Sequence, residues 1–361
     1  PGQSPTNTLR YDYEKSHTGS DSHPNNLANE TIGPRFAEFI VDTIEGAPAP
    51  GSTVLRVPQD YATIAAAEAA AQDGDTVEIA AGTYTGSDMV ATWDQNDLTI
   101  RGVGGQAHLD ADGVAIANGK AIWVTTGDNI TIEDIAFSHA VVDDANGAGI
   151  RSEGDRLTVR NCRFNDNQMG ILTSNNGSEE ITIEYCEFDH NGLGSPGYTH
   201  NIYVGRAAKF TLRGGYSHHA IHGHNVKSRA AENHILYNRI MDESDGQSSY
   251  LIDLPNGGLS YLIGNVLHQG GGAENVHMIS YAAEGADNPI QALYVSANTL
   301  VNERHSGDGF RLAGTPTAHF INNLFSGVDE TVIGDTSVFT GNLSTDESSF
   351  SDPEHFDFHL T

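Results

Sequence analysis

Two stretches of the sequence repeat a histidine–asparagine pair and then place different proton-carrying side chains after it. THNIYVG spans residues 199–205 and GHNVKSR spans residues 223–229. The pair recurs after 24 residues, and at the same interval Tyr203 of the first stretch corresponds to Lys227 of the second. Both side chains exchange protons, with ordinary pKa values of about 10. The spacing predicts a structural repeat that sets two proton carriers side by side.

These residue types suit the removal of a proton next to a carboxylate. In a uronic-acid polymer, β-elimination takes the C5 proton, beside the C6 carboxylate, and expels the sugar oxygen at C4. A cation must neutralise the carboxylate, while a base takes the C5 proton and an acid protonates the leaving oxygen. Neighbouring cations lower the pKa of tyrosine and of lysine. We therefore expect Tyr203, Lys227 and Arg229 to form one reactive group.

Short alternating phrases recur along the chain at steps mostly in the mid-twenties. From residue 98 onward they include LTIRGV, ITIEDIAF, LTVRNCRF, ITIEYCEF and FTLRGGYS, and a second set includes GIRS, GILT, NIYVG, NVKSR, YLIDL, HMISY and GFRLA. Alternation of apolar and polar residues indicates half-buried strands, and a fixed period of this length indicates a solenoid. Without helices between the strands, the pattern predicts an all-β fold, a single right-handed parallel β-helix.

The same alternation predicts which side chains face outward. Ile202 and Val204 fit the core, so their neighbours point out, and Val226 and Ser228 are expected to point in. The outward set carries histidine, asparagine, tyrosine, lysine and arginine. We expect it to contain the catalytic candidates Lys227, Tyr203, Arg229, His200 and His224, and the substrate-binding candidates Asn201, Asn225, Arg151, Arg311, His277 and Tyr281.

The two ends of the predicted β-helix also have recognisable patterns. The polar residues 1–52 are expected to be a loosely attached extension, and residues 53–361 the catalytic β-helix. The stretch 57–84 contains an alanine-rich segment, for which we predict a helix over 61–72. It resembles the cap that opens many secreted right-handed β-helix proteins, and a solenoid needs such a cap over its first coil. DPEHFDFHL, residues 352–360, resembles a common terminal phrase of that group.

Two further repeats are expected to stabilise neighbouring coils. Stacked amides satisfy hydrogen bonds from coil to coil, and related phrases predict an asparagine ladder of Asn265, Asn298, Asn323 and Asn342. Cys162 and Cys186 are 24 residues apart. Adjacent strands are close enough for a disulfide, so both a disulfide and stacked buried thiols remain open, and we favour the thiols.

The outward residues resemble those of the right-handed β-helix polysaccharide lyases, including alginate lyases and the chondroitinase B type. The resemblance implies that Lys227 is the base and Tyr203 the acid or co-base. It implies that Arg229, Asn201, Asn225, His200 and His224 are candidates to neutralise the substrate carboxylate. Some members of the group use calcium, but no acidic cluster stands in this column, so we expect no required cofactor. The resemblance implies a secreted or periplasmic lyase, with alginate the favoured substrate.

The composition of the chain limits the kinds of molecule that it can bind. The formal net charge of −30 over 361 residues argues against nucleic acid and anionic membranes, and no apolar run is long enough to span a bilayer. Residues 200–239, however, hold six of the 18 Lys and Arg and six of the 17 His. This basic island in an acidic chain predicts an anionic polysaccharide as the partner of a monomer.

Four other functions remain open. A C5-epimerase shares the first half of the lyase chemistry, and a binding or adhesive solenoid would need none of it. A glycoside hydrolase needs paired carboxylates; Asp253 is the conspicuous acid, with Asp242, Glu243 and Asp245 in the preceding loop. Because Asp253 matches Ser228 and Ser280, we expect it to point inward and stabilise a turn. A zinc enzyme needs three or four ligands, which His222 and His224 with His200 or His218 could supply, but we predict no metal.

Overall fold

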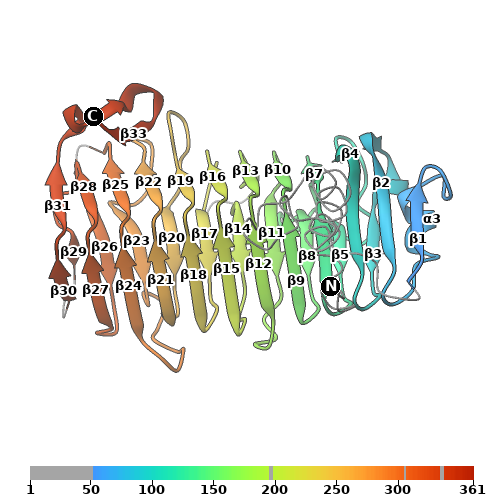
Figure 1. Ribbon diagram of the computed structural model, residues 1–361, viewed down its shortest axis with the longest axis horizontal. Helices are drawn as coiled ribbons and strands as arrows, with labels where there is room; N and C mark the ends of the chain where they lie inside the picture. The colour runs from blue at the N-terminus through green and yellow to red at the C-terminus, as the bar shows by residue number, and fades with distance from the viewer. Residues whose placement is uncertain (1–51, 195–197, 305, 334–336) are drawn as a thin grey trace, which may run out of the picture. The chain divides into compact units, whose positions relative to one another are not determined.

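The computed structural model of the protein describes residues 52–194, 198–304, 306–333 and 337–361. These residues form the predicted parallel β-helix, in which strands of successive coils pair in parallel and stack side by side (Figure 1). Residues 52–361 form one compact unit, and residues 1–51 of the predicted extension lie outside the described residues. Within the described part, no helix is long and apolar enough to cross a membrane.

One sheet, called the first sheet below, contains ten strands in the described part of the chain. Each coil contributes one strand to it, and neighbouring strands are parallel. Its strands are β3 (Ala91–Trp93), β5 (Ala121–Thr125), β8 (Ala148–Ser152), β11 (Met169–Thr173), β14 (Ile202–Val204), β17 (His224–Ser228), β20 (Tyr250–Leu254), β23 (His277–Tyr281), β26 (Asp308–Leu312) and β29 (Val332–Ile333).

The second sheet contains 21 strands among the described residues, because most coils enter it twice, before and after a tight corner. It begins with β1 (Val54–Val57), β2 (Thr76–Thr85) and β4 (Thr99–Asp110). Before the corner lie β6 (Ile130–Glu133), β9 (Arg156–Arg160), β12 (Glu180–Glu184), β15 (Lys209–Arg213), β18 (Glu232–Leu236), β21 (Leu259–Ile263), β24 (Ala292–Ser296), β27 (Thr317–Ile321) and β30 (Ser337–Thr340). After it lie β7 (Ile135–Ser138), β10 (Arg163–Asn165), β13 (Glu187–Asp189), β16 (Tyr216–His218), β19 (Arg239–Met241), β22 (Val266–Gln269), β25 (Thr299–Asn302), β28 (Leu324–Ser326) and β31 (Leu343–Thr345).

The corner of the second sheet carries the predicted asparagine ladder. Side-chain amides donate to the carboxamide oxygen of the next coil at 2.9–3.0 Å, through Asn238, Asn265, Asn298, Asn323 and Asn342. The preceding residue is left-handed, as at Tyr237 with φ 57°, which turns the chain sharply. Earlier coils place Cys162 and Cys186 at this corner as free, buried thiols, so the expectation of stacked thiols is confirmed.

Packing inside and charge outside both follow the coil repeat. In the core, neighbouring rings lie 4.7–5.4 Å apart along the series Trp93, Trp123, Phe137, Phe164 and Phe188. On the outer face of the second sheet, Glu133, Arg160, Glu184 and Arg213 pair in turn at 3.2, 2.9 and 2.7 Å. Stacking therefore places aromatic rings beside one another in the core and opposite charges beside one another on the outer face of the second sheet.

The N-terminal cap is present but its helix is shorter than the predicted 61–72. The helix α3 (Ile64–Glu68) begins at Thr63, whose hydroxyl accepts from the Ala66 N–H at 3.1 Å. It ends early because Asp75 accepts from the backbone N–H groups of Gln72 and Thr53, at 2.9 and 2.7 Å. These bonds turn the chain back onto β1. The buried Ile64 and Ala67 belong to the core cluster that the cap closes.

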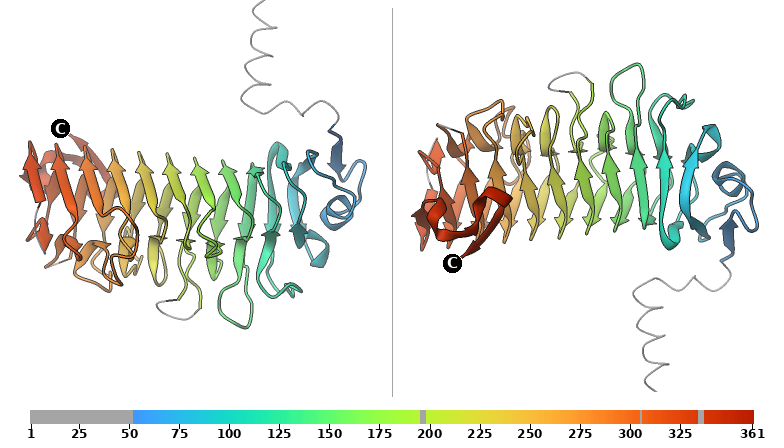
Figure 2. Two further views of the ribbon diagram at one scale, coloured as in Figure 1. Left: turned by 90° about the horizontal axis from the view of Figure 1, so that it is seen from below. Right: turned by 90° about the horizontal axis from the view of Figure 1, so that it is seen from above.

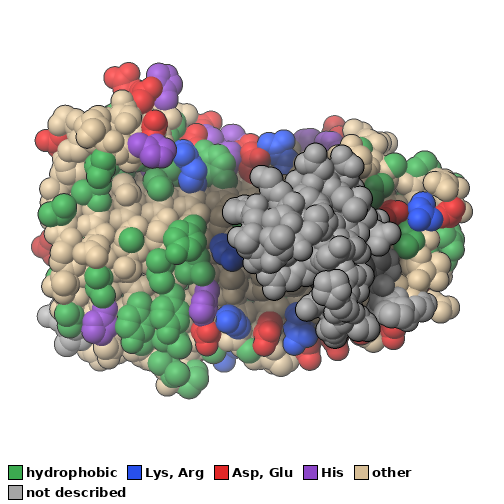
Figure 3. All heavy atoms as spheres, viewed as in Figure 1, with side chains coloured by type: hydrophobic (Ala, Val, Ile, Leu, Met, Phe, Trp, Pro, Cys, Tyr) green, Lys and Arg blue, Asp and Glu red, His purple; other side chains and the backbone are tan. Residues whose placement is uncertain are grey.

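The remaining elements are short and lie at loops and at the C-terminal end. They are the 3-10 helices η2 (Ser87–Met89), η3 (Glu347–Ser349) and η4 (Pro353–His355) and the antiparallel pair β32 (Phe350–Asp352) and β33 (Asp357–Leu360). Phe350 and Phe358 of this pair pack with Met241 and Val301. Longer loops project from the edges of the coil stack (Figure 2). On the face seen in Figure 3, outside its grey part, charged and histidine side chains lie mostly along the two long edges.

Candidate active site

The first sheet brings the predicted proton carriers together. Pairing of β14 with β17 sets Tyr203 opposite Lys227, which confirms the 24-residue register. Arg151 lies in the same row, two strands before Tyr203, with Leu172 between them. Arg311 is also in this row, separated from Asp253 by Ser280. Because adjacent strands are about 4.8 Å apart, these two arginines lie toward the ends of the row.

Asp253 belongs to this row, so the expectation that it points inward is wrong. β17 pairs with β20 in the register that sets Lys227 opposite Asp253. The carboxylate Oδ2 lies 3.3 Å from Lys227 Nζ and 3.3 Å from His224 Nε2. A shift of one residue in register moves every side chain of a strand to the other face, and matching Asp253 to Ser228 made that error. The row therefore reads Tyr203, Lys227, Asp253 in successive coils.

A second carboxylate, from the loop after β23, reaches the two main cations of the site. Glu284 Oε1 lies 3.2 Å from Lys227 Nζ, and Glu284 Oε2 lies 2.6 Å from Arg229 Nη2. Arg229 also donates from Nε to the Tyr203 hydroxyl oxygen at 2.8 Å and from Nη1 to Asn256 Oδ1 at 2.7 Å. Lys227 and Arg229 thus hold one carboxylate beside the tyrosine hydroxyl, and this carboxylate is half exposed, at 49%.

His200 and His224 stack behind these groups, with ring centroids 4.9 Å apart. Backbone N–H groups fix both rings: that of His224 donates to His200 Nδ1 at 3.0 Å, and that of Tyr250 donates to His224 Nδ1 at 3.1 Å. In neutral rings the proton therefore sits on Nε2, and His224 Nε2 faces Asp253. His200 meets the Tyr203 ring edge-on at 5.2 Å. The two histidines position Tyr203 and Asp253 and are almost fully buried themselves.

The electrostatics keep the carboxylates ionised and the inner histidine neutral. Burial would raise the pKa of Asp253, but the hydrogen bond from His224 and the charge of Lys227 hold it below its usual value. For Glu284, burial is likewise outweighed by Arg229 and Lys227, and the pKa is lowered. Burial, together with nearby His224, Lys227 and Arg229, lowers the pKa of His200 well below its usual value. The site therefore offers fixed charges and one buried neutral imidazole.

A groove borders Tyr203 on the side of the earlier coils. It has a volume of about 400 Å³, and its lining includes Arg151, Leu172, Asn175, Tyr198 and Tyr203. The size suits a sugar unit, and the lining combines an aromatic ring with a cation. The arrangement can hold a carboxylate between Lys227 and Arg229, beside the Tyr203 hydroxyl.

Three sequence-based site assignments are wrong because the side chains are buried. Asn201 and Asn225 are fully buried and form a second ladder at the edge between the second and first sheets, with Asn191 donating to Asn201 Oδ1 and Asn201 donating to Asn225 Oδ1, both at 3.0 Å. Tyr281 is fully buried and donates to the Gly258 carbonyl at 2.6 Å; burial raises its pKa to about 12. These side chains hold the coils together and do not reach a substrate.

Other candidates lie apart from the central group. His277 pairs with Asp308 at 3.2 Å on a later coil. The histidine grouping that a zinc enzyme would need does not form, because His224 faces Asp253, His222 lies 4.0 Å from Glu274, and His218 lies beside His219. Asp242 is fully buried and accepts the last amide of the second ladder, that of Asn225, at 3.1 Å. Neither the zinc grouping nor the acids of 242–245 belong to this site.

Sequence reasoning missed Glu284 and Asn256. Glu284 is 57 residues from Lys227, and Asn256, in the loop after β20, donates to Asp287 Oδ2 at 2.9 Å. Both stand in loops, outside the strand repeat that produced the other candidates. One signal could have found Glu284. Its loop follows the strand β23, whose Ser280 stands in the same row as Lys227 and Asp253.

No protein-family model matches the chain, and no curated protein matches it. Among solved structures it is similar to ORF18 of Geobacillus virus E2, with 14% identity and a TM-score of 0.42 over 89% of this chain and 64% of that one. It therefore spans less than two thirds of the viral chain. It is similar to the A-module of the mannuronan C-5 epimerase AlgE6 of Azotobacter vinelandii (15% identity, TM-score 0.46, 78% and 93% covered) and to a rice weevil pectin methyl esterase (11%, 0.39, 82% and 90%).

Proposed function

We propose that the protein is a polysaccharide lyase that cleaves a uronic-acid polymer, with alginate the favoured substrate, by β-elimination. One observation carries the proposal: Lys227 and Arg229 together hold a half-exposed carboxylate next to the Tyr203 hydroxyl. In the proposed complex, the C6 carboxylate of the substrate replaces Glu284. The exchange of one carboxylate for another leaves the local charge unchanged, so the cations keep a partner throughout.

Carboxylate binding at this place lowers the barrier to removing the C5 proton. Charge develops on the carboxylate as the proton leaves, and Lys227 and Arg229 are fixed to stabilise it. Because Lys227 Nζ contacts two carboxylates, we assign Lys227 to charge neutralisation rather than to the role of base. Asp253 and Glu284, both within 3.3 Å of Nζ, supply those contacts.

Proton transfer then falls to Tyr203. In its ionised form, the phenolic oxygen takes the C5 proton, the electron pair forms the C4–C5 double bond, and the C4–O4 bond breaks. The same hydroxyl then returns the proton to O4, which regenerates the starting state. Arg229 Nε, at 2.8 Å, gives this oxygen a charged donor throughout the cycle. We propose that the reaction uses no cofactor and, because the polymer is too large to enter a cell, that the protein is secreted or periplasmic.

The carboxylates argue against a glycoside hydrolase. Such an enzyme needs one carboxylic acid that stays protonated, with a raised pKa, to serve as the general acid. The neighbouring cations instead lower the pKa of both Asp253 and Glu284. Neither carboxyl group carries a proton to donate at neutral pH.

The proposal is tested by incubating the protein with polymannuronate, polyguluronate, pectate, glucuronan and chondroitin and following the ultraviolet absorbance of the new double bond. We expect absorbance to grow on one of them. Reducing ends without absorbance would instead identify a hydrolase. A change in C5 configuration without cleavage would identify an epimerase, and binding without any reaction a non-catalytic solenoid.

Variants separate the assigned roles. Tyr203→Phe should lower kcat on the order of 10²–10⁴-fold, as expected for loss of a proton carrier. Lys227→Arg keeps the charge and should retain far more activity than Lys227→Ala. Lys209→Ala is the control, because this lysine lies on the second sheet beside Glu232. Full activity in Tyr203→Phe, with none in Lys227→Arg, would return the role of base to Lys227.

A further inference from the structure

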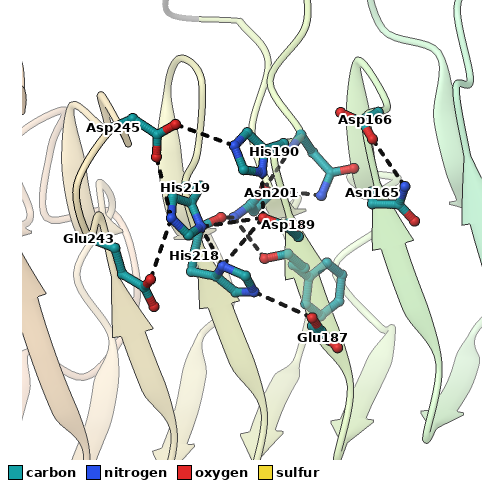
Figure 4. Close-up of polar contacts among 12 residues, drawn as sticks. Asn165, Asp166, Glu187, Asp189, His190, Asn201, His218, His219, Glu243 and Asp245 are labelled. Carbon is teal, nitrogen blue, oxygen red and sulfur yellow. Dashed lines mark hydrogen bonds and ion pairs between the residues drawn. The ribbon is translucent and has the colours of Figure 1, made fainter. Parts of the chain in front are cut away.

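A histidine cluster lies on the second sheet, away from the row described above. It consists of His190, His218, His219, Asp189, Glu243 and Asp245 (Figure 4). Asp189 and His218 end the strands β13 and β16, and the next residue in each coil is a histidine in left-handed conformation, with φ 50° at His190 and 47° at His219. This shared turn stacks the two rings with centroids 4.7 Å apart and an interplanar angle of 10°.

The outer ring nitrogens of the stacked pair face carboxylates. His219 Nε2 lies 3.3 Å from Asp245 Oδ1 and 3.4 Å from Glu243 Oε2. His190 Nε2 lies 3.7 Å from the other Asp245 oxygen, Oδ2. The ligand atoms of His190, His219 and Asp245 all lie within 4.8 Å of one another. Two nitrogens and the Asp245 carboxylate thus converge on one small volume from three successive coils, and Glu243 borders it through its contact with His219.

The inner ring nitrogens face a single carboxylate. Asp189 Oδ1 lies 2.5 Å from His190 Nδ1 and 3.3 Å from His219 Nδ1. One oxygen of Asp189 therefore faces the Nδ1 atoms of both stacked rings. A carboxylate behind a histidine in this way fixes the tautomer whose outer nitrogen is free to bind a metal.

His218 adds to this arrangement from the buried side. Its Nδ1 lies 2.5 Å from His219 Nδ1 and 3.3 Å from Asp189 Oδ1. The His218 side chain is only 8% exposed, so this contact is shielded from solvent. His219 Nε2 faces Asp245 and Glu243, and a cation between them would make this contact favourable.

We propose that His190 Nε2, His219 Nε2, Asp245 and Glu243 bind a divalent transition-metal ion, with zinc as the best match, and that Asp189 is its outer-shell carboxylate. Two imidazoles with two carboxylates suit zinc and similar ions, whereas calcium and magnesium prefer oxygen ligands alone. The ion ties three successive coils of the β-helix. Asp245 is 65% exposed, so the ion enters from solvent.

The test uses the full, untagged chain, stripped of metal with a chelator and titrated with zinc chloride in a calorimeter at neutral pH. We expect one zinc ion per chain at this site, little heat from calcium or magnesium, and a higher thermal midpoint with zinc. His190→Ala and His219→Ala should each weaken this binding at least tenfold. Asp189→Asn should weaken it about 10–100-fold, the usual effect of losing an outer-shell partner.

The matched control is His139→Ala. His139 occupies the same left-handed turn on an earlier coil and pairs with Asp110 at 2.7 Å and with Asp166 at 4.0 Å, and among the described residues no second histidine ring stacks on it. Its zinc affinity should equal that of the wild type. Circular dichroism checks that each variant is folded. Zinc binding that is absent, or unchanged in both His190→Ala and His219→Ala, would overturn the proposal and leave an ion-pair cluster only.

Discussion

Lys227 and His200 show how burial and charge are balanced at single residues. Lys227 is only 7% exposed, and two carboxylates compensate its charge. Breaking a buried ion pair by removing one partner typically costs about 3–5 kcal/mol, because the other charge is left uncompensated. His200 is equally buried but has no carboxylate contact among those described, so it remains neutral instead. The fold therefore compensates the charge of Lys227 and keeps His200 uncharged.

His200 should make the protein less stable in mild acid. In the unfolded chain its imidazole takes up a proton below about pH 6.5, whereas in the folded state its pKa lies well below that value. The unfolded state then binds more protons than the folded state. The free energy of unfolding therefore decreases as the pH is lowered, by up to about 1.4 kcal/mol per pH unit.

Chemical denaturation at pH 7.5 and pH 5.5 tests this effect. The loss of stability between these values should be smaller in His200→Asn, which retains an acceptor for the His224 N–H. The quantity to compare is the difference in the free energy of unfolding between the two pH values. This difference does not include the loss of stability that the substitution itself causes at both pH values. Equal losses in the variant and in the wild type would show that His200 is protonated in the folded protein.

At the scale of elements, two asparagine ladders hold successive coils in register at different edges. One follows the corner of the second sheet, and the other runs from Asn167 to Asn225 and ends on Asp242. Most of these amides also satisfy a backbone group that a turn leaves unpaired, as Asn265 does when it donates to the Ile235 carbonyl at 2.8 Å. The second ladder fixes the start of β17 and thus the position of His224 and Lys227.

Asn265→Ala should lower the free energy of unfolding by about 1–3 kcal/mol, because it leaves buried groups without a hydrogen-bond partner. The groups affected are the Ile235 carbonyl and the backbone N–H of Asn238. Urea denaturation measures the change. Asn342→Ala is the control: this residue ends the ladder and is only partly buried, so water can replace it and the loss should be smaller. Equal losses would contradict a burial-dependent role.

At the scale of the whole molecule, the charge opposes the proposed substrate. The chain carries a formal net charge of −30, and its binding cations are themselves paired with carboxylates. An anionic polymer is therefore repelled at long range and attracted only at contact. Such repulsion acts over the Debye length, which is about 30 Å at 0.01 M salt and about 8 Å at 0.15 M.

Moderate salt should therefore help the protein to capture the proposed substrate. We expect kcat/KM on the uronate polymer to rise as sodium chloride increases from about 0.01 to about 0.15 M. Initial rates at low substrate concentration measure it, and the same series on a short, singly charged uronate substrate should change less. A steady fall in kcat/KM over this range would mean that the local cations dominate the encounter.

Much of the fold could be predicted from the sequence, because a solenoid repeats a local pattern. Alternation and the mid-twenties period were sufficient for the β-helix, the Asn265–Asn342 ladder and the pairing of Tyr203 with Lys227. They also placed Arg151 and Arg311 in the correct row. Each of these depends only on neighbouring strands, whose side chains alternate with a period of two.

Only the tertiary structure decided the rest, because coil length and loop path are not repeated. The register between β17 and β20 turned Asp253 outward, and the turn before β14 turned Asn201 inward. Glu284 reaches Lys227 across 57 residues. Histidines of successive coils stack at His190 and His219 because both coils make the same left-handed turn. A one-residue change in a loop reverses the faces of the next strand, and residue spacing alone does not reveal that change.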